Sequence, residues 1–342
     1  MYTELLDGEL LLDSADLLAR SGVRPEDVAV LSGTLLEGFG NRYSDLDLYV
    51  IGHELPLKGP GVPAMLVVRE DGRIRRVNES LESAARVILD IQYYTFRELS
   101  TLARSLTALY SEARQSTQIF RKTLHQDDED LIHKLLTGTV LQDGTGSFNA
   151  HQIFSPAVFS FLKYRNEVGG YAEFRDLVGS WSDGDLDTCL YNIRGYLVSQ
   201  VSGLMFLAGN TNPRPKWFTR RLKVLSPAYD GLREGVISWL HSPRNSDSQK
   251  REAVESACDL IELAYVHIRD LLGKDPQWFT VEEALTLTEA ELAERPTRDR
   301  DTLDEFHLRR RMFSSAAPSL ISQIKSESRR ATARPESRPI SC

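Results

Sequence analysis

Residues 28–51 decide the fold, and they read VAVLSGTLLEGFGNRYSDLDLYVI. The apolar run from Val28 to Leu31 predicts a first strand. The run from Asp45 to Ile51, which alternates polar and apolar residues in its first half and closes at Gly52, predicts a second strand. A connection that contains three glycines, residues 33–44, separates the two. We therefore expect this part of the chain to form the centre of a β-sheet.

The flanking sequence extends this sheet and then changes to helical periodicity. Residues 6–21 predict a helix that ends before Gly22, residues 62–77 predict a hairpin that turns at Asp71-Gly72, and residues 87–94 predict a further strand. No strand is expected after residue 95. Helices are expected at residues 96–124, 127–136, 156–168, 186–208, 217–225, 229–240 and 248–272. The predicted fold class is α+β, with an N-terminal mixed β-sheet flanked by helices and a C-terminal helical bundle domain.

Composition places the chain among ordinary globular proteins. It has 342 residues, of which 41% are hydrophobic and 26% charged, and this length predicts two domains. The sequence shows neither a membrane-spanning apolar run nor a secretory signal, so we expect a cytoplasmic protein without a membrane partner. The three cysteines show no disulfide or zinc spacing. The net charge of −8 argues against nucleic acid as a partner.

The C-terminal end differs from the rest in charge. Residues 309–342 carry eight Lys or Arg residues and two Glu residues. Residues 314–342 also have a bias toward Ser, Arg, Pro and Ala, and such a segment buries little apolar surface. We expect a basic, disordered and solvated tail, with an electrostatic arm for an acidic partner as the alternative.

The second predicted strand carries two carboxylates on one face. Asp45 and Asp47 are two residues apart, so their side chains point to the same side of the strand, about 7 Å apart. Two carboxylates so close repel each other unless a cation lies between them. Hard divalent ions with oxygen ligands are the usual solution.

A third carboxylate lies in a later strand. Asp90 interrupts the apolar run of residues 87–91, and a charge in a buried strand is costly unless it is paired or bound to metal. If that strand neighbours the Asp45–Asp47 strand, the three carboxylates would hold two Mg²⁺ ions, with Mn²⁺ as an alternative.

Ser32-Gly33-Thr34 directly follows the first strand. A glycine lets backbone N–H groups approach phosphate oxygens, and a neighbouring hydroxyl extends such a cradle. The spacing of the glycines fits neither a dinucleotide fingerprint nor a P-loop. This segment is therefore a phosphate cradle of another type, or only a turn.

The stretch from Gly33 to Leu48 resembles the signature of the DNA polymerase β-like nucleotidyltransferase superfamily. That signature is a Gly-Ser pair, about ten residues with a further glycine, and then Ser-Asp-x-Asp before apolar residues. The resemblance covers residues 28–94 when Asp90 is included. It implies that Gly33 and Thr34 hold the nucleotide phosphates, with Ser44 beside them. It also implies that Asp45 and Asp47 bind metal and that Asp90 completes the site and helps to deprotonate the acceptor. Thr34 stands where serine is commoner.

A second stretch adds a basic residue to this prediction. Pro215-Lys216-Trp217 resembles the proline-lysine-tryptophan turn in the helical domain of some small-molecule-modifying nucleotidyltransferases, which implies that Lys216 reaches the triphosphate. The alternative is a helix start with Trp217 in the core. Lys163 and Arg165 are a weaker version of the same idea.

Other polar clusters have simpler explanations. The second Asp-x-Asp, at residues 183–187, precedes an amphipathic helix and is expected to cap it. The acidic residues at 127–130, between His125 and His133, are expected to form a solvated helix start rather than a metal cluster. Residues 143–147 are expected to form a plain loop.

The predicted function is metal-dependent transfer of NMP from an NTP, ATP first, to a hydroxyl acceptor, with release of pyrophosphate. The expected partners are the nucleotide and a small-molecule acceptor. The expected division is a catalytic domain at residues 1–124, a helical substrate-binding domain at 125–313 and the tail at 314–342. The alternatives are synthesis of a nucleotide signal or oligonucleotide, AMPylation of a protein, and a non-catalytic nucleotide-binding scaffold.

Overall fold

A computed structural model describes residues 2–5, 10–41, 44–54, 66–68, 74–82, 88–212, 214–295 and 300–332. The chain divides into two compact units. The first, called here the sheet unit, comprises residues 1–108, 124–156 and 212–217. The second, the helical unit, comprises residues 109–123, 157–211 and 218–342.

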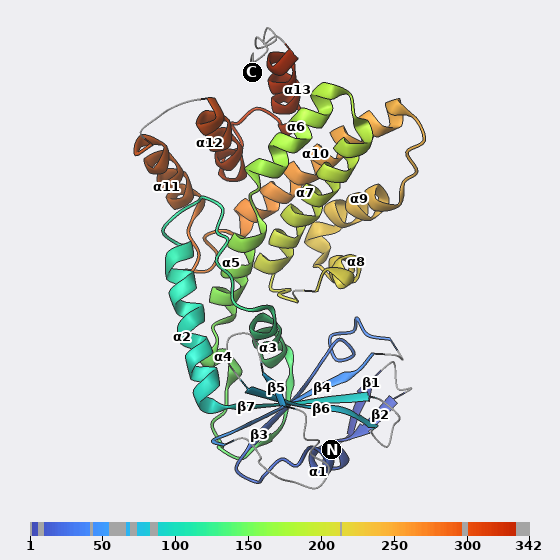
Figure 1. Ribbon diagram of the computed structural model, residues 1–342, viewed down its shortest axis with the longest axis vertical. Helices are drawn as coiled ribbons and strands as arrows, with labels where there is room; N and C mark the ends of the chain where they lie inside the picture. Colours follow the sequence, from blue (N-terminus) through green and yellow to red (C-terminus); the bar gives the residue numbers. More distant parts are fainter. Residues whose placement is uncertain are drawn as a thin grey trace, which may run out of the picture. The chain divides into compact units, whose positions relative to one another are not determined.

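The sheet unit is built on a six-stranded sheet in the order β5-β6-β7-β4-β3-β8 (Figure 1). The strands are β3 (Val28–Ser32), β4 (Leu46–Gly52), β5 (Leu66–Val68), β6 (Ile74–Glu82), β7 (Ile88–Thr95) and β8 (Thr139–Asp143). β4 and β7 are parallel, and the other neighbouring pairs are antiparallel. The sheet is therefore mixed, and with the helices that follow it the predicted α+β class is confirmed.

The strands expected at residues 28–31, 45–51 and 87–94 are confirmed as β3, β4 and β7. β5 pairs with β6 as the expected hairpin requires, and its turn at Asp71-Gly72 lies outside the described residues. The helix expected at residues 6–21 is shorter. α1 spans Ser14–Ser21, while β1 (Tyr2–Leu5) and β2 (Leu10–Asp13) form a separate two-stranded sheet. The Asp13 side chain accepts a hydrogen bond from the Ala15 amide, and this cap sets the later start.

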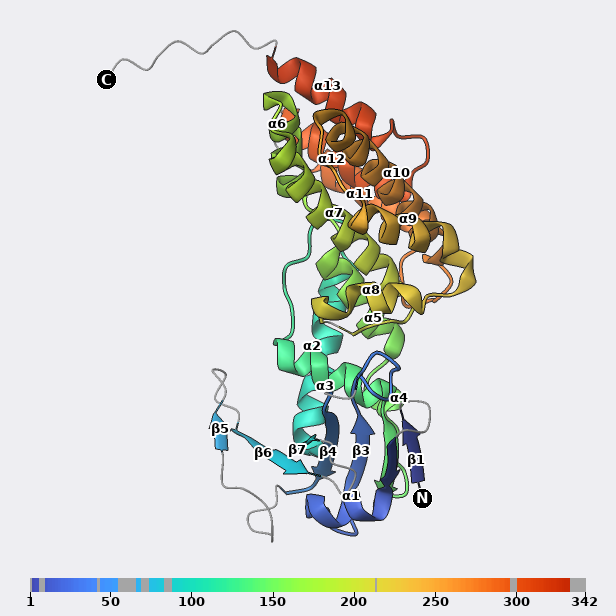
Figure 2. The same cartoon turned by 90° about the vertical axis from the view of Figure 1, so that its right-hand side faces the viewer.

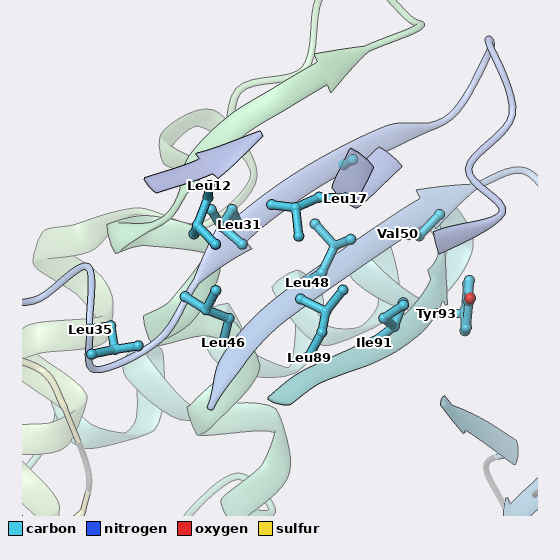
Figure 3. Packing of buried hydrophobic residues seen from close by; sticks show 11 residues of the cluster. Leu12, Leu17, Leu31, Leu35, Leu46, Leu48, Val50, Leu89, Ile91 and Tyr93 are labelled. Carbon is cyan, nitrogen blue, oxygen red and sulfur yellow. The ribbon is translucent and has the colours of Figure 1, made fainter. Parts of the chain in front are cut away.

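One face of the central strands packs into a core. Alternate residues of β4 and β7 belong to it, because successive side chains on a strand point to opposite faces. Leu12 and Leu17, from β2 and α1, cover this face. Figure 3 shows the cluster, which includes Leu31, Leu46, Leu48, Leu89 and Ile91. Every residue of β4 is buried, so the opposite face is also covered. Helix α3 (Gln126–Thr137) lies next to the central strands in both ribbon views (Figures 1 and 2).

The expectation that no strand follows residue 95 is wrong. β8 pairs antiparallel with β3 at the edge of the sheet and is partly exposed along its length. Such a short, half-exposed strand carries little alternation, which is why its pattern did not separate it from a loop. Because β8 belongs to the sheet, residues 124–156 group with the sheet unit. The expected boundary at residue 124 therefore differs from the observed division.

The helical unit confirms most of the expected helices. α2 (Phe96–Ala113) begins in the sheet unit and ends earlier than expected. The other expected helices are α5 (Pro156–Glu167), α7 (Leu186–Leu207), α8 (Phe218–Lys223), α9 (Asp230–His241) and α10 (Asp247–Leu271). Further helices are α4 (Ala150–Ile153) in the sheet unit and, in the helical unit, α6 (Tyr171–Asp183), α11 (Val281–Ala293), α12 (Arg300–Phe313) and α13 (Leu320–Thr332). No helix among the described residues is both long and apolar enough to cross a bilayer.

The basic C-terminal stretch differs from the expected solvated tail. α13 buries Leu320 and Ile324 completely. Arg309 pairs with Glu291, and Arg311 lies 3.5 Å from Glu262, with both arginines buried. The basic residues at 309 and 311 are thus ion-paired inside the helical unit rather than presented to an acidic partner. Residues 333–342 lie outside the described part of the chain.

Candidate active site

Three neighbouring strands place polar side chains side by side. Ser32 of β3 is the register partner of Asp47 on β4, and Asp47 is the register partner of Asp90 on β7. These positions alternate with the core residues, so the three side chains lie on the face opposite the apolar cluster. The predicted neighbourhood of the Asp47 and Asp90 strands is present, in parallel register.

A pocket of about 540 Å³ opens at this place, and all of its lining residues belong to the sheet unit. The sequence prediction included six of them: Thr34, Ser44, Asp45, Asp47, Asp90 and Lys216. The structure adds Asn41, Tyr49, Gln92, Asp127, Asp130, His133, Lys134, Asn212, Arg214 and Trp217. The carboxylates and the cations thus face one volume.

Gly33 shapes the pocket from behind. Its φ is +118°, a conformation that side-chain-bearing residues rarely adopt, and a Cβ atom there would lie 2.8 Å from the Asp47 Oδ2 atom. The Gly33 carbonyl accepts hydrogen bonds from the amides of Leu36 and Glu37, at 3.0 and 3.2 Å. The chain therefore turns tightly directly after β3, which brings Thr34 to the pocket wall while leaving room for the Asp47 carboxylate.

Ser44 closes the same connection. Its hydroxyl oxygen accepts a hydrogen bond from the Asn41 amide at 3.0 Å, and its own amide donates to the Asn41 carbonyl at 2.8 Å. This pair of bonds fixes the chain immediately before the two aspartates. Asp45 precedes the first residue of β4 and is exposed, so its carboxylate meets solvent at the rim of the pocket.

Asp47 is the buried carboxylate of the group. Its side chain is 7% exposed and lies 2.5 Å from the Lys134 ammonium, measured from Oδ1 to Nζ. Burial raises the pKa of Asp47 to about 6, against the opposing effect of Lys134 and with a further contribution from the charges of Asp45 and Asp90. Burial is therefore the dominant effect on the pKa of this carboxylate.

Asp90 keeps one oxygen without a protein donor. Its Oδ2 atom accepts a hydrogen bond from the Gln92 side chain at 2.9 Å. Its Oδ1 atom is buried and has no hydrogen-bond partner among the described residues, and the same is true of the Ser32 hydroxyl. A buried oxygen left in this state is costly unless something else satisfies it.

These oxygens suit a hard divalent cation. Among the described residues, no three Asp, Glu, His or Cys side chains form a group that could hold a metal ion by themselves. The donor set nevertheless fits Mg²⁺, because two carboxylates in register, one of them with an unsatisfied buried oxygen, supply the oxygen ligands that this ion prefers.

A buried network supports the wall of the pocket. Glu37 lies 3.0 Å from His133 on α3 and accepts hydrogen bonds from the Asn212 side-chain amide at 3.2 and 3.3 Å. Burial by itself would raise the pKa of Glu37, but His133, Asn212 and Lys134 together lower it. The carboxylate thus stays charged and joins three parts of the chain that are far apart in sequence.

Residues 212–217 complete the pocket with positive charge. Arg214 is exposed and donates to Asp130 of α3. A short 3₁₀ helix, Pro215–Trp217, follows, and the Lys216 ammonium lies 5.1 Å from the centre of the Trp217 ring. Lys216 therefore faces the same volume as the aspartates, and half-buried Trp217 lines the pocket.

Sequence reasoning missed the contribution of α3. Asp127, Asp130 and Lys134 recur at helical spacing, which places them on one face, but a polar face that meets solvent has the same spacing. The expected solvated helix start is wrong for Asp128, Glu129 and Asp130, which are buried because the helix packs on the sheet. His125 caps the helix through its side chain.

The remaining candidates have structural roles. Arg165 is buried in the helical unit, where it donates to the carbonyls of Ser116 and Gln118, and Lys163 lies over the Phe206 ring, so neither lines the pocket. Asp185 caps α7, as expected for the second Asp-x-Asp. In the loop at 143–147, the Asp143 carboxylate accepts hydrogen bonds from the backbone amides of Thr145 and Gly146, as in a plain turn.

Comparison with known proteins finds similarity to a solved structure but none to a family model or a curated sequence. A scan against protein-family models finds no match, and no curated protein matches the sequence. Among solved structures, the chain is similar to a nucleotidyltransferase-like protein from Exiguobacterium sibiricum 255-15, with 12% identity and a TM-score of 0.34 over 82% of this chain and 87% of that one. At this level of similarity, the interpretation of the pocket rests on its own geometry.

Proposed function

We propose that this chain is a metal-dependent nucleotidyltransferase of the DNA polymerase β-like superfamily, which moves NMP from an NTP to an acceptor hydroxyl and releases pyrophosphate. The observation that carries the proposal is the register of Asp47 and Asp90 on parallel β4 and β7, beside the Gly33 turn. Asp45, Asp47 and Asp90 all line one pocket with Thr34 and Lys216. This is the constellation that the sequence motif implies.

Each part of the pocket has a role in this reaction. Asp45, Asp47 and Asp90 would hold Mg²⁺, which supplies charge neutralisation at the attacking and leaving oxygens. The Gly33–Thr34 turn and Ser44 would receive the phosphates, and Lys216 would neutralise the triphosphate. Asp90, whose Oδ1 atom is unsatisfied, would also accept the acceptor proton. Positioning and electrostatics would account for most of the rate enhancement.

The acceptor that we favour is a small molecule, and the nucleotide that we favour is ATP. A chain with a net charge of −8 is unfavourable for a nucleic-acid acceptor. The pocket also contains Asp127 and Asp130 besides the three aspartates of the motif, so its wall is mixed in charge and strongly polar. A polyhydroxylated or amine-bearing small molecule fits such a lining better than an extended phosphate backbone does.

The test is pyrophosphate release with each of the four NTPs, Mg²⁺ and a panel of hydroxyl acceptors. Asp47→Asn and Asp90→Asn are expected to abolish release. Asp187→Asn is the matched control, because Asp187 also belongs to an Asp-x-Asp but is exposed in the helical unit and pairs with Lys250. Retained release in Asp47→Asn or Asp90→Asn would refute the mechanism.

The same reactions separate the alternative acceptors. Products that form from nucleotide alone would indicate synthesis of a nucleotide signal, and labelled protein would indicate AMPylation. Nucleotide binding without pyrophosphate release on any acceptor would favour a scaffold.

A further inference from the structure

Lys134 lies in the pocket but belongs to no part of the sequence motif. It comes from α3, and its ammonium contacts Asp47 and lies 5.9 Å from the centre of the Tyr49 ring. The Lys134 side chain is only 20% exposed. A largely buried ammonium thus already occupies an oxygen of the carboxylate that the proposed reaction assigns to metal.

We propose that Lys134 is a built-in counter-ion, which competes with the divalent cation for Asp47 and, once displaced, binds the triphosphate of the incoming nucleotide. This inference rests on the function proposed above and assigns Lys134 as a nucleotide-binding residue of that site.

Lys134 and the divalent cation compete for the Asp47 carboxylate because both are positively charged and both need its oxygens. The Asp47 Oδ1 atom is bonded to Lys134, and its Oδ2 atom lies against the Gly33 turn. A divalent ion that takes Asp47 as a ligand therefore meets the ammonium at the same carboxylate, and two adjacent cations repel each other. The lysine has to give way, and metal binding without nucleotide carries that cost.

Once metal has taken Asp47, the Lys134 ammonium needs another anion as its partner. A largely buried ammonium is unfavourable without a partner. Glu37 is close enough for Lys134 to lower its pKa, but its oxygens already bond to His133 and Asn212. Lysine is a common ligand of phosphate, and Thr34 and Lys216 line the same pocket. The triphosphate is then the anion that receives Lys134.

This exchange couples the two ligands. Nucleotide binding provides the partner that metal binding removes from Lys134, so each ligand strengthens the binding of the other, and the coupling is reciprocal. Metal binding alone is weak. The free energy of binding metal and nucleotide together is more favourable than the sum of the free energies of binding each one alone.

The experiment measures Mn²⁺ binding to the full chain by electron paramagnetic resonance of the free ion, with and without α,β-methylene-ATP. Lys134→Gln is expected to tighten Mn²⁺ binding without nucleotide about tenfold or more, because a charged hydrogen bond no longer competes. It is also expected to reduce the enhancement that nucleotide gives. Lys134→Arg retains the charge and is expected to bind Mn²⁺ no more tightly than wild type.

The control is Lys122→Gln, which removes an exposed lysine paired with Glu112 in the helical unit and is expected to leave Mn²⁺ binding unchanged. If wild type binds Mn²⁺ and the nucleotide analogue, but Lys134→Gln binds Mn²⁺ as wild type does, this inference alone is refuted. If wild type binds neither ligand, both this inference and the proposed function are refuted.

Discussion

Asp47 and Asp90 are register partners on two parallel strands, and both carboxylates face the side of the sheet that carries the pocket. Two acidic side chains in adjacent strands repel each other. The sheet nevertheless keeps them together, because the residues on either side of each aspartate are part of the apolar core. Apolar packing on one face of the sheet thus holds the two strands together, and the repulsion between the two carboxylates acts on the other face.

The buried carboxylate makes stability depend on pH. The pKa of Asp47 is about 6 in the folded chain and has an ordinary value of 3.8, so folding favours the protonated form. The stabilisation that comes from this shift is fully present at a pH below the ordinary pKa of 3.8, and it is lost as the pH rises through about 6. Between pH 7.5 and pH 5, we expect wild type to gain about 1 kcal/mol over Asp47→Asn in urea unfolding. Asp187→Asn, at an exposed site, should show no such change, and a flat difference for Asp47→Asn would contradict the assignment.

Gly33 offers a test of the close approach between the turn and Asp47. Gly33→Ala should lower the free energy of unfolding by roughly 1–3 kcal/mol and reduce pyrophosphate release, because the new Cβ would press on the Asp47 carboxylate. Gly38→Ala is the matched control, since Gly38 also has a positive φ, +75°, but a Cβ there meets nothing within 4 Å. Equal effects of the two substitutions on pyrophosphate release would show that backbone strain, and not the contact with Asp47, is responsible.

Lys216 should contribute to nucleotide affinity rather than to stability. It is exposed, and its ammonium lies over Trp217 at the pocket. We expect Lys216→Ala to weaken ATP binding in calorimetry by about tenfold, the loss of one charged contact, with unchanged thermal unfolding. Lys223→Ala, an exposed lysine at the end of α8, is the control and should bind ATP as wild type does. The prediction fails if the two variants have the same ATP affinity.

Glu37 should be important for stability, although the sequence motif assigns it no role. Glu37→Gln leaves His133 and Asn212 with a neutral partner in a buried setting, and we expect a loss of roughly 1–3 kcal/mol in chemical unfolding. Because the pKa of Glu37 is lowered in the folded chain, the stability it provides is present above its ordinary pKa and is lost as the pH falls further. A variant as stable as wild type at neutral pH would show that the network does not support the pocket.

The sequence predicted the centre of this structure better than its edges. β3, β4 and β7 carry strong apolar patterns, and the three aspartates stand out against them, so the sheet and its acidic face followed from residue type and period. β8 did not, because it is short, half-exposed and pairs with a strand more than 100 residues earlier, and such pairing leaves no local signal.

The cationic side of the pocket was the harder part. Lys134 lies on an amphipathic helix whose polar face is indistinguishable, from spacing alone, from one that meets solvent. Only the packing of α3 on the sheet shows that this face turns toward Asp47. Lys216 was found through a short resemblance, whereas Asn212, three residues before that motif, was identified only by its hydrogen bonds to Glu37.

Residues 212–217 belong to the sheet unit, although α7 and α8 of the helical unit precede and follow them in the chain. The pocket is therefore assembled from a discontinuous stretch of polypeptide. A fragment that stops after residue 156 would retain all three aspartates but lack Asn212, Arg214 and Lys216. Domain shuffling by a single crossover, whether in the laboratory or in evolution, would for this reason separate the acidic half of the pocket from part of its basic half.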